Sequence, residues 1–377
     1  MTAWFVLGLA VAAGVATAAI GMWRAQRRDG RLSFEDFIAM AFAWVAVVFC
    51  GSVVGVGMLG FDVWDLISVV YVPAVAGLPV AAVLLVGSHV ASGWVSWCRP
   101  LTRPALVGAA ALMLLAPLGF YATHVAPFDL QVDEIDVIVG ESRIEEPIVV
   151  GVISDIQTEH LTDYEKSAVR ELVDADPDVI LIAGDVWQGS AAGFEAEREE
   201  LRALFEFMSP PAGAFLVTGD VDSSDELAVL TEGTDVRVLD GEIARTEVAG
   251  TDITIGGVGL RPRPRDREMI DDLESAPGDD LRVLLAHRPD WAFELPTSSR
   301  IDLVVAGHTH GGQIQIPGLG AAATASQRVP RDAAAGGLHE LNGNTTYIST
   351  GVGHEQQGAP QVRFLAPPSI GVLTLRP

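Results

Sequence analysis

The first third of the chain contains four long apolar stretches separated by short polar segments. A helix needs roughly 20 apolar residues to cross the hydrocarbon core of a bilayer, and the stretches approach or exceed that length. Because charged residues lie only between them, a set of buried helices in a soluble domain is the less favoured interpretation. The pattern predicts four membrane-spanning helices, at about residues 3–23, 38–60, 66–91 and 104–121.

The first stretch has a second interpretation, a cleaved signal peptide, because small residues lie at positions 16–19. A signal peptide usually begins with a basic segment and has an apolar run of roughly 7–15 residues. Residues 1–4 contain no basic side chain, and the apolar run is longer than that. We therefore expect this stretch to be retained as a membrane span.

After about Asp129 the hydrophobic pattern changes. Short β-branched runs alternate with amphipathic segments of helical period and with turns that contain Gly and Pro, which is typical of an α/β domain. The sequence therefore predicts a transmembrane region at residues 1–125 and an α/β domain at residues 126–377, which is large enough for one hydrophobic core.

The two parts also differ in charge. The chain has 24 basic and 49 acidic residues and a net charge of −25 at pH 7. Residues 1–124 contain six basic and five acidic residues, which leaves 18 basic and 44 acidic residues, or −26, for the rest. Binding to nucleic acid requires basic patches that neutralise phosphates, so we expect no nucleic-acid partner. The two cysteines, Cys50 and Cys98, lie within or beside the apolar stretches, so no disulfide framework is expected.

Five apolar runs in the second part end on side chains that can bind a metal ion. The carboxyl ends of strands in an α/β sheet form the crevice where ligands bind, so these side chains are predicted to converge. They are Asp155 after residues 148–154, Asp185 after 179–184, Asp220 after 214–219, His287 after 283–286, and His308 and His310 after 303–307.

Each of these residues has an ordinary structural explanation when it is taken alone. An Asp after a strand is commonly a helix N-cap or a turn residue, and a lone His is more often a surface or core residue. Five coincidences weaken that explanation, and the Gly-His-Thr-His-Gly-Gly run at 307–312 presents two imidazoles from a tight, glycine-rich turn. Carboxylates and imidazoles without thiolates suit Mn, Fe, Zn or Mg. The ligands suffice for two divalent ions, which in hydrolytic sites lie about 3.5–4 Å apart.

Longer motifs make the sequence similar to the calcineurin-like metallophosphoesterases, and within them to the membrane-associated bacterial phosphodiesterase branch. The resemblance covers the chain from about Ile135 to the C-terminus, and its Gly-His-Thr-His-Gly-Gly-Gln run is highly specific. The motifs are Asp-Ala-Asp-Pro-Asp at 174–178, Leu-Ala-His-Arg-Pro-Asp at 285–290, Gly-His-Thr-His-Gly-Gly-Gln at 307–313 and Tyr-Ile-Ser-Thr-Gly-Val-Gly at 347–353.

The resemblance implies a four-layer α/β/β/α sandwich, here preceded by the four-helix transmembrane region. It also implies hydrolysis of a phosphomonoester or phosphodiester by a hydroxide that two metal ions activate. Asp185, which would bridge the ions, and His308 are the expected catalytic residues. The implied ligands are Asp155, Asp185 and His310 for one ion, and Asp185, Asp220, His287 and His308 for the other.

The chain departs from the family pattern at two motifs. Two residues after the first aspartate the family has a metal-binding histidine, whereas this chain has Gln157, whose carbonyl oxygen is a weaker ligand. The third motif has Asp220 and Val221 in place of Asn-His, and valine cannot protonate a leaving group, which is typically worth roughly 10²- to 10⁴-fold in rate. His160 and His354 are candidate substitutes, although a solvent-exposed bystander is the favoured interpretation of each.

Two classes of function therefore stay open. The favoured one is a metallophosphoesterase that acts outside the membrane, with a lipid-linked or cell-envelope phosphate as a candidate substrate. The alternative is a catalytically weakened homologue that binds metal or a phosphorylated ligand as a sensor or scaffold. The altered pair Gln157 and Val221 is the feature that divides the two.

The arginines between the apolar stretches predict the orientation in the membrane, because short loops rich in Lys and Arg stay in the cytoplasm. Arg24, Arg27, Arg28 and Arg31 follow the first stretch and Arg99 and Arg103 precede the fourth, whereas residues 61–65 carry only acidic charges. This places both termini and the acidic domain of a multi-pass cell-membrane protein outside the cytoplasm.

A reporter that is active only in the cytoplasm is therefore expected to be silent when it is fused after Pro377. The same reporter fused after Arg31 is the matched control and should give a signal, because the first arginine loop is predicted to lie inside. A strong signal from the fusion after Pro377 would overturn the orientation without bearing on the chemistry of the domain.

Overall fold

The computed structural model describes residues 2–27, 31–59, 63–96, 98–139, 144, 146–276, 278, 280–356 and 359–377. The chain forms two compact units, one of Met1–Val125 with Gln357–Gln361 and the other of Ala126–Gln356 with Val362–Pro377. Arg28, in the first predicted arginine loop, and Phe61 and Asp62, in the predicted acidic loop, lie outside the described residues.

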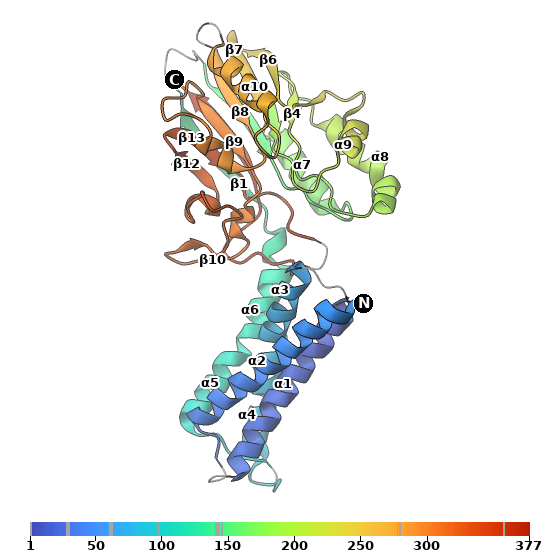
Figure 1. Cartoon of the computed structure of the whole chain (residues 1–377), viewed down its shortest axis with the longest axis vertical. Helices are drawn as coiled ribbons and strands as arrows, with labels where there is room; N and C mark the ends of the chain where they lie inside the picture. Colours follow the sequence, from blue (N-terminus) through green and yellow to red (C-terminus); the bar gives the residue numbers. More distant parts are fainter. Residues whose placement is uncertain are drawn as a thin grey trace. The chain divides into compact units, whose positions relative to one another are not determined.

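The N-terminal unit consists of long apolar helices (Figure 1). Within the described part of the chain, four helical spans are long and apolar enough to cross a membrane, and each overlaps one of the predicted stretches. Large side chains such as Phe42 (72% exposed) and Val107 (70% exposed) cover their outer surfaces, a composition that marks a membrane-facing surface rather than a water-facing one. These features indicate membrane association. The spans are Ala3–Arg27, Glu35–Leu59, Asp65–Ala91 and Arg103–Phe128.

The helices of this unit are interrupted at two π turns and at one short break. Pro73 begins the second π turn, which joins two helices into a single span. The regular hydrogen-bond ladder is interrupted here because proline has no backbone N–H to donate to it. The elements are α1 (Thr2–Arg27), α2 (Phe34–Val54), η1 (Gly55–Leu59), α3 (Val63–Val72), η2 (Pro73–Gly77), α4 (Leu78–Ala91), α5 (Arg103–Met113) and α6 (Leu115–His124).

Small residues let α1 and η2 approach each other closely. A Cβ at Gly14 would lie 2.4 Å from the carbonyl oxygen of Gly77, and a Cβ at Gly77 would lie 2.6 Å from that of Ala10. Backbone contact through small residues is the usual way in which membrane helices associate, because apolar burial gives little driving force in lipid. Glycine is therefore required at both positions.

Asp36 links the end of α1 to the start of α2. Its fully buried carboxylate accepts hydrogen bonds from the Nε of Arg24 at 3.1 Å and from the backbone N–H and hydroxyl of Ser33 at 2.9 Å each. The carboxylate near the first turn also complements the positive end of the α2 dipole. One arginine of the predicted cytoplasmic loop therefore has a structural role.

The C-terminal unit contains two six-stranded mixed sheets and a two-stranded hairpin, β10 (Gln315–Ile316) with β11 (Gly320–Ala321). In order across the first sheet the strands are β1 (Gln131–Ile138), β14 (Ser369–Arg376), β2 (Ile148–Ile153), β3 (Val179–Ile182), β4 (Ala214–Leu216) and β5 (Val236–Val238). In order across the second they are β12 (Gly337–Leu341), β13 (Asn344–Ile348), β9 (Leu303–Ala306), β8 (Leu281–Leu285), β7 (Thr251–Gly257) and β6 (Glu242–Val248).

The two sheets pack face to face around the main hydrophobic core. Alternate residues of the central strands, such as Val150 and Leu181 of the first sheet and Val283 and Val305 of the second, meet in this layer. The opposite faces of the same strands pack against helices, so every position of β3, β8 and β9 is buried. Parallel strands covered on both faces require this nearly continuous apolar sequence.

Helices cover the outer face of each sheet (Figure 1). On the first sheet, α7 (Asp163–Asp174), α8 (Ala191–Phe207) and α9 (Ser224–Thr231) pack their apolar sides onto the strands. On the second, α10 (Pro264–Glu274) does so through Met269 and Leu273. The predicted four-layer α/β/β/α sandwich is confirmed. The parallel strands β2 to β5 and β7 to β9 point their carboxyl ends to the same edge of each sheet.

Candidate metal centre

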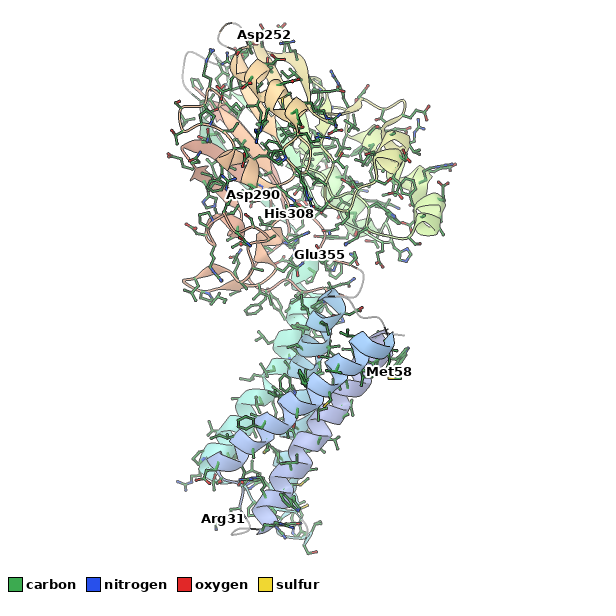
Figure 2. All side chains as sticks on the ribbon, in the orientation of Figure 1. Arg31, Met58, Asp252, Asp290, His308 and Glu355 are labelled. Carbon is green, nitrogen blue, oxygen red and sulfur yellow. The ribbon has the colours of Figure 1, made fainter. Side chains whose placement is uncertain are left out.

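The predicted side chains of both sheets meet at the carboxyl ends of their strands. His287, which follows β8, places its Nε2 atom 3.4 Å from Oδ2 of Asp185 and 3.4 Å from Oδ2 of Asp220. The Nδ1 atom of His308 lies 2.9 Å from Oδ2 of Asp220. At the other end of the group, Nε2 of His310 lies 3.7 Å from Oδ1 of Asp155. His308 is labelled in Figure 2.

The backbone that carries these side chains is strained. A positive φ is uncommon outside glycine, and it costs on the order of 1–3 kcal/mol where a side chain is present. Such strain persists only where the surroundings hold it, and it concentrates at functional sites. The predicted site residues with positive φ are Asp155 (48°), Gln157 (43°), Asp185 (56°), His308 (73°) and His310 (50°).

Two glycines permit the close packing of these loops. A Cβ at Gly219 would lie 2.1 Å from Oδ1 of Asp185, and a Cβ at Gly307 would lie 2.4 Å from Oδ2 of Asp155. Any side chain at either position would displace a carboxylate. The glycine before Asp220 and the glycine before His308 are therefore parts of the site.

His287 is oriented as a metal ligand. Its Nδ1 lies 2.7 Å from the carbonyl oxygen of Ala183, to which it donates, so that Nε2 points at the carboxylates. The ring is 1% exposed, and its Nε2 atom has no hydrogen-bond partner among the described residues. A hydrogen bond on one ring nitrogen commonly fixes the other for a metal. A buried nitrogen that faces two carboxylate oxygens without a hydrogen bond fits a divalent ion between them.

Two overlapping groups of side chains could each hold one ion. Within each group the ligand atoms lie no more than 4.8 Å from one another. One group is Asp220, His287 and His308, and the other is Asp155, Asp185 and His287. The second group contains His287 where the family resemblance assigned His310. The division of the ligands between two ions stays a prediction.

The charges of the centre shift the protonation of its members. Burial opposes a charge on His287, but Asp185, Asp220 and Asp155 together raise its pKa well above the usual value. Burial raises the pKa of Asp155 to about 6, with His287 opposing and the charge of Asp185 adding to the effect. The carboxylates therefore require positive charge, which a proton on His287 or a cation can supply.

Asp220 is held by a cation as well as by the histidines. The Nε of Arg288 donates to its Oδ2 at 3.0 Å, and the Nη2 of Arg288 donates to its Oδ1. Burial opposes ionisation, but the neighbouring His287, His308 and Arg288 lower the pKa of Asp220 far below its usual range. Arg288 directly follows His287, and its role at the site was not predicted from the sequence.

Asp222 is a second residue that the sequence reasoning missed. Its carboxylate accepts hydrogen bonds from the backbone N–H groups of Asp185 at 2.9 Å, Val186 at 2.7 Å and Gly219 at 2.7 Å. Burial and the charge of Asp185 raise its pKa to about 6, although these hydrogen bonds oppose the shift. Asp222 thus ties the loop after β3 to the loop after β4. The signal that could have found it was the acid at the end of residues 219–222, one position after Val221.

Arg363 is a third missed residue, and it is completely buried. It donates to the carbonyl oxygens of His310 at 3.0 Å, Thr350 at 2.8 Å and Gly351 at 3.3 Å, and to that of Gly353. Burial lowers its pKa to about 10, a value at which the guanidinium stays charged at neutral pH. Arg363 therefore joins the His310 turn to the closing loop at 350–353.

The first departure from the family pattern lies inside the centre. Gln157 is 0% exposed, and neither atom of its side-chain amide has a hydrogen-bond partner of good geometry among the described residues. Its backbone carbonyl accepts a hydrogen bond from Nε2 of Gln356 at 3.1 Å. The side chain of Gln188 accepts from the backbone N–H of Gln356 at 2.9 Å and donates to the carboxylate of Glu355 at 3.1 Å. Burial raises the pKa of Glu355, and Asp185 adds to the shift. Glu355, labelled in Figure 2, thus brings a further carboxylate close to the site.

The second departure also lies beside the centre, because the backbone N–H of Val221 donates to Oδ1 of Asp185 at 2.9 Å. Of the candidate substitutes for the missing histidine, His160 is 79% exposed in its side chain and lies 2.9 Å from Glu197, which supports the bystander interpretation. His354 lies close enough to His310 to contribute to lowering its pKa. His354 is therefore nearer to the centre than His160.

Fold and site together define a two-sheet α/β sandwich with an Asp/His cluster of the kind that holds divalent ions for hydrolysis. Residues 148–312 match the calcineurin-like phosphoesterase family. The C-terminal unit therefore contains a calcineurin-like phosphoesterase domain, as the motifs predicted, and the broad class that this indicates is a phosphoesterase hydrolase.

Similar proteins carry the same family name. The chain is 28% identical over 211 residues to an uncharacterized metallophosphoesterase of Aquifex aeolicus (strain VF5), which covers 53% of this chain and 73% of the relative. It is 25% identical over 241 residues to the uncharacterized metallophosphoesterase YkuE of Bacillus subtilis (strain 168), and this alignment covers 58% of this chain and 76% of the relative. A solved structure, Haemophilus influenzae NAD nucleotidase, is similar at a TM-score of 0.34 and 15% identity, over 44% of this chain and 39% of that one. That likeness is too low to extend the argument.

Asp185→Ala is expected to abolish stoichiometric binding of two metal ions by the purified chain, because Asp185 is the predicted bridging ligand and lies 3.4 Å from His287, the residue that the two groups share. Elemental analysis after removal of free metal measures the content. Asp252→Ala, at an exposed carboxylate of β7, is the matched control and should leave it unchanged. Unaltered metal content in Asp185→Ala, or no metal in any preparation, would show that the dinuclear interpretation is wrong.

Arg363→Met is expected to destabilise the C-terminal unit by about 3–5 kcal/mol, since it leaves several buried carbonyl oxygens without their donor. Thermal unfolding of the detergent-solubilised chain measures the loss. Arg245→Met, at an exposed arginine of β6, should shift the midpoint little. Equal stability of the two variants would contradict the role given to Arg363.

Proposed function

We propose that this chain is a metal-dependent phosphoesterase of the membrane-associated branch of its family, with its domain on the extracytoplasmic side. The observation that carries the proposal is the buried Nε2 atom of His287, which lies 3.4 Å from carboxylate oxygens of both Asp185 and Asp220 and makes no hydrogen bond to any described residue. Such a nitrogen is costly to bury unless it has a partner, and a divalent ion is the partner that suits all three ligands.

The proposed centre takes two divalent ions, drawn from Mn, Fe, Zn and Mg. When bound, they would supply an activated water and positive charge for the phosphoryl oxygens. The proposed ligands of one ion are Asp155, Asp185 and His310, with the side-chain oxygen of Gln157 proposed as a further, weaker ligand. Those of the other are Asp185, Asp220, His287 and His308.

The chain's own residues prepare the centre for a phosphoester. The Ala183 carbonyl holds His287 in one tautomer and orientation, and Arg288 fixes both oxygens of Asp220. His308, with 15% of its side chain exposed, is the imidazole that can reach a phosphoryl oxygen as negative charge develops on it. We therefore assign catalytic roles to His308 and to the bridging Asp185.

The substrate is proposed to be a small phosphoester rather than a polyanion. The C-terminal part carries a charge of −26, which repels nucleic acid at long range. A chain that is held at a bilayer by four apolar spans meets lipid-linked and cell-envelope phosphates at high local concentration. Such a phosphoester, either a monoester or a diester, is the proposed class.

The alternative function is a weakened homologue that binds metal or a phosphorylated ligand as a sensor or scaffold. Two observations favour it. Gln157 puts an amide in the place of an imidazole, and Val221 has only its backbone N–H directed at Asp185. Metal-dependent turnover of a chromogenic bis-aryl phosphodiester by the purified chain separates the two functions.

Val221→His is expected to raise the turnover of an alkyl phosphoester by up to roughly 10²- to 10⁴-fold, the range of general-acid catalysis. An aryl ester should gain little, because its leaving group is already a stable anion and needs no proton. Matched kcat measurements on both esters test this. Val221→Asn, which can donate a hydrogen bond but no proton, is the control for charge stabilisation alone.

An equal gain for both esters would show that the imidazole acts by stabilising charge rather than by protonating the leaving group. No turnover by any variant with two bound metal ions would favour the sensor or scaffold.

A further inference from the structure

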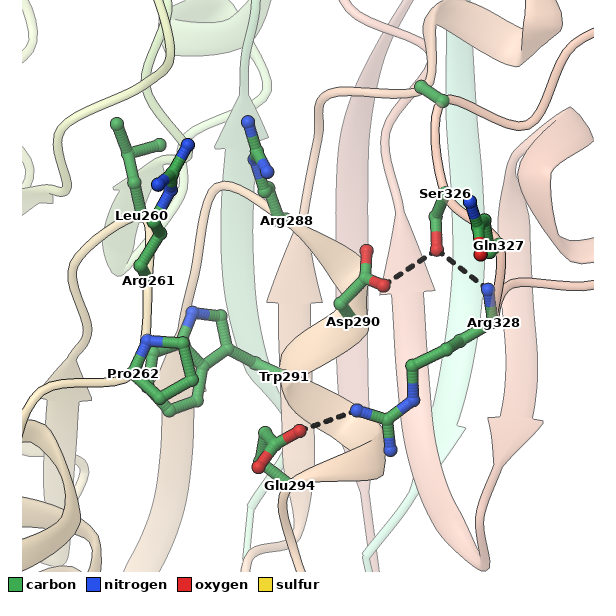
Figure 3. A pocket seen from close by; sticks show the side chains of 11 residues that line it. Leu260, Arg261, Pro262, Arg288, Asp290, Trp291, Glu294, Ser326, Gln327 and Arg328 are labelled. Carbon is green, nitrogen blue, oxygen red and sulfur yellow. Dashed lines mark hydrogen bonds and ion pairs between the residues drawn. The ribbon is translucent and has the colours of Figure 1, made fainter.

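A cavity of about 450 Å³ lies beside the candidate metal centre. Arg288, which donates to Asp220, forms part of its wall. The cavity is therefore directly adjacent to the metal-binding side chains. Leu260, Pro262 and Trp291 give it an apolar side, and the Trp291 ring is drawn beside Pro262 (Figure 3). The indole of Trp291 is 2% exposed and donates to the carbonyl oxygen of Gly259 at 2.9 Å, so this wall is fixed.

The cavity is rich in arginine although the domain around it is strongly acidic. Arg261, Arg288 and Arg328 all line it. Its two acidic side chains are already engaged, because Asp290 accepts from the hydroxyl of Ser326 at 2.6 Å and Glu294 pairs with Arg328 at 2.5 Å. The two acidic side chains of the cavity therefore only partly neutralise its three arginines.

Of the three arginines that line the cavity, Arg288 binds Asp220 and Arg328 pairs with Glu294, which leaves Arg261. It is exposed, and among the described residues it makes neither a hydrogen bond nor an ion pair. In Figure 3 it extends in the same direction as Arg288, whose guanidinium binds Asp220. The arginines at positions 263 and 265, close in sequence, are both paired with Asp240. An unpaired arginine in a domain with 44 acidic residues in its part of the chain is available to a ligand.

We propose that this cavity binds the leaving group of the substrate, and that the leaving group carries a second anionic group, a carboxylate or a phosphate, which Arg261 binds. The proposal rests on the proposed function, since a phosphoester held at the metal centre would extend its leaving group past Asp220 and Arg288 into the cavity. The apolar wall of Leu260 and Pro262 suits the body of such a group, and the planar guanidinium binds carboxylate and phosphate with two hydrogen bonds.

Non-hydrolysable probes test the cavity without depending on turnover. Calorimetric titration of the full chain in detergent, with metal present, compares phenylphosphonate with 4-carboxyphenylphosphonate and 1,4-phenylenediphosphonate. We expect the two doubly anionic probes to bind the wild type about three- to tenfold more tightly than phenylphosphonate, the gain from one charge-assisted contact at a partly exposed site. The carboxylate and phosphonate probes distinguish the two kinds of anion.

Arg261→Ala should remove this preference and leave the dissociation constant of phenylphosphonate unchanged, whereas Arg261→Lys should keep part of it as a point charge. Arg245→Ala, at an exposed arginine outside the cavity, is the control for a change in net charge. Equal affinities of the wild type for all three probes would overturn the proposal, as would an equal loss for all three in Arg261→Ala.

The two proposals can fail separately. If the wild type binds the probes with the expected preference but hydrolyses no phosphoester, the cavity stands and the proposed hydrolase fails. If phenyl phosphate is hydrolysed but the anionic probes show no preference, the hydrolase stands and the role of Arg261 fails.

Discussion

The repulsion among carboxylates at one edge of the two sheets is the constraint on which the rest of the C-terminal unit depends. Asp155, Asp185, Asp220 and Asp222 all follow strands that end there. Two like charges 4 Å apart repel by about 4 kcal/mol at an effective dielectric constant of 20, which is a large part of the stability of an ordinary domain. Burial raises the pKa values of Asp155 and Asp222 to about 6, and the charge of Asp185 adds to both shifts. Divalent cations would relieve the repulsion, and their binding energy would then be folding energy.

The protein meets this constraint partly with its own cations and backbone. Arg288 neutralises Asp220, and three backbone N–H groups converge on Asp222. The positive φ angles of Asp155 and Asp185 turn these carboxylates into the centre. The two core layers behind the strands resist relaxation of that strain, because a well-packed interior deforms little. The packed sheets thus hold the strained loops, and the carboxylates that they carry, in a geometry that short loops alone would not maintain.

The hydrophobic pattern of the chain was sufficient to predict the five strands that lead to the site, because an apolar run and the residue at its end are both local features of the sequence. A continuous apolar run such as residues 179–184 followed by Asp is visible without knowledge of its neighbours. The structure brings Asp220, His287 and His308 together, and Asp155 and Asp185 with them, whereas His310 lies 3.7 Å from Asp155 and outside both groups.

What could not be predicted depends on partners far apart in the chain. Arg363 acts through carbonyl groups as distant as that of His310, 53 residues earlier, and nothing in its local sequence marks it as buried. Glu355 is brought to the site by Gln188, 167 residues away. Arg261 differs from Arg263 and Arg265, which pair with Asp240, in having no partner among the described residues, and the sequence does not reveal this difference. Long-range pairing, rather than residue type, decides which polar groups serve the site.

The same electrostatics explains how a strongly acidic domain can be selective for an anionic substrate. Exposed charges are screened beyond a Debye length of about 8 Å at physiological ionic strength, so a ligand inside the cavity experiences Arg261 and Arg288 more strongly than the distant acidic surface. A long polyanion would have to lie against that surface and would be repelled along its length. A small phosphoester with a second anionic group meets only the local cations. The acidic surface and the arginine-lined cavity would therefore favour the proposed class of substrate for different reasons, the surface by repelling polyanions and the cavity by binding a compact dianion.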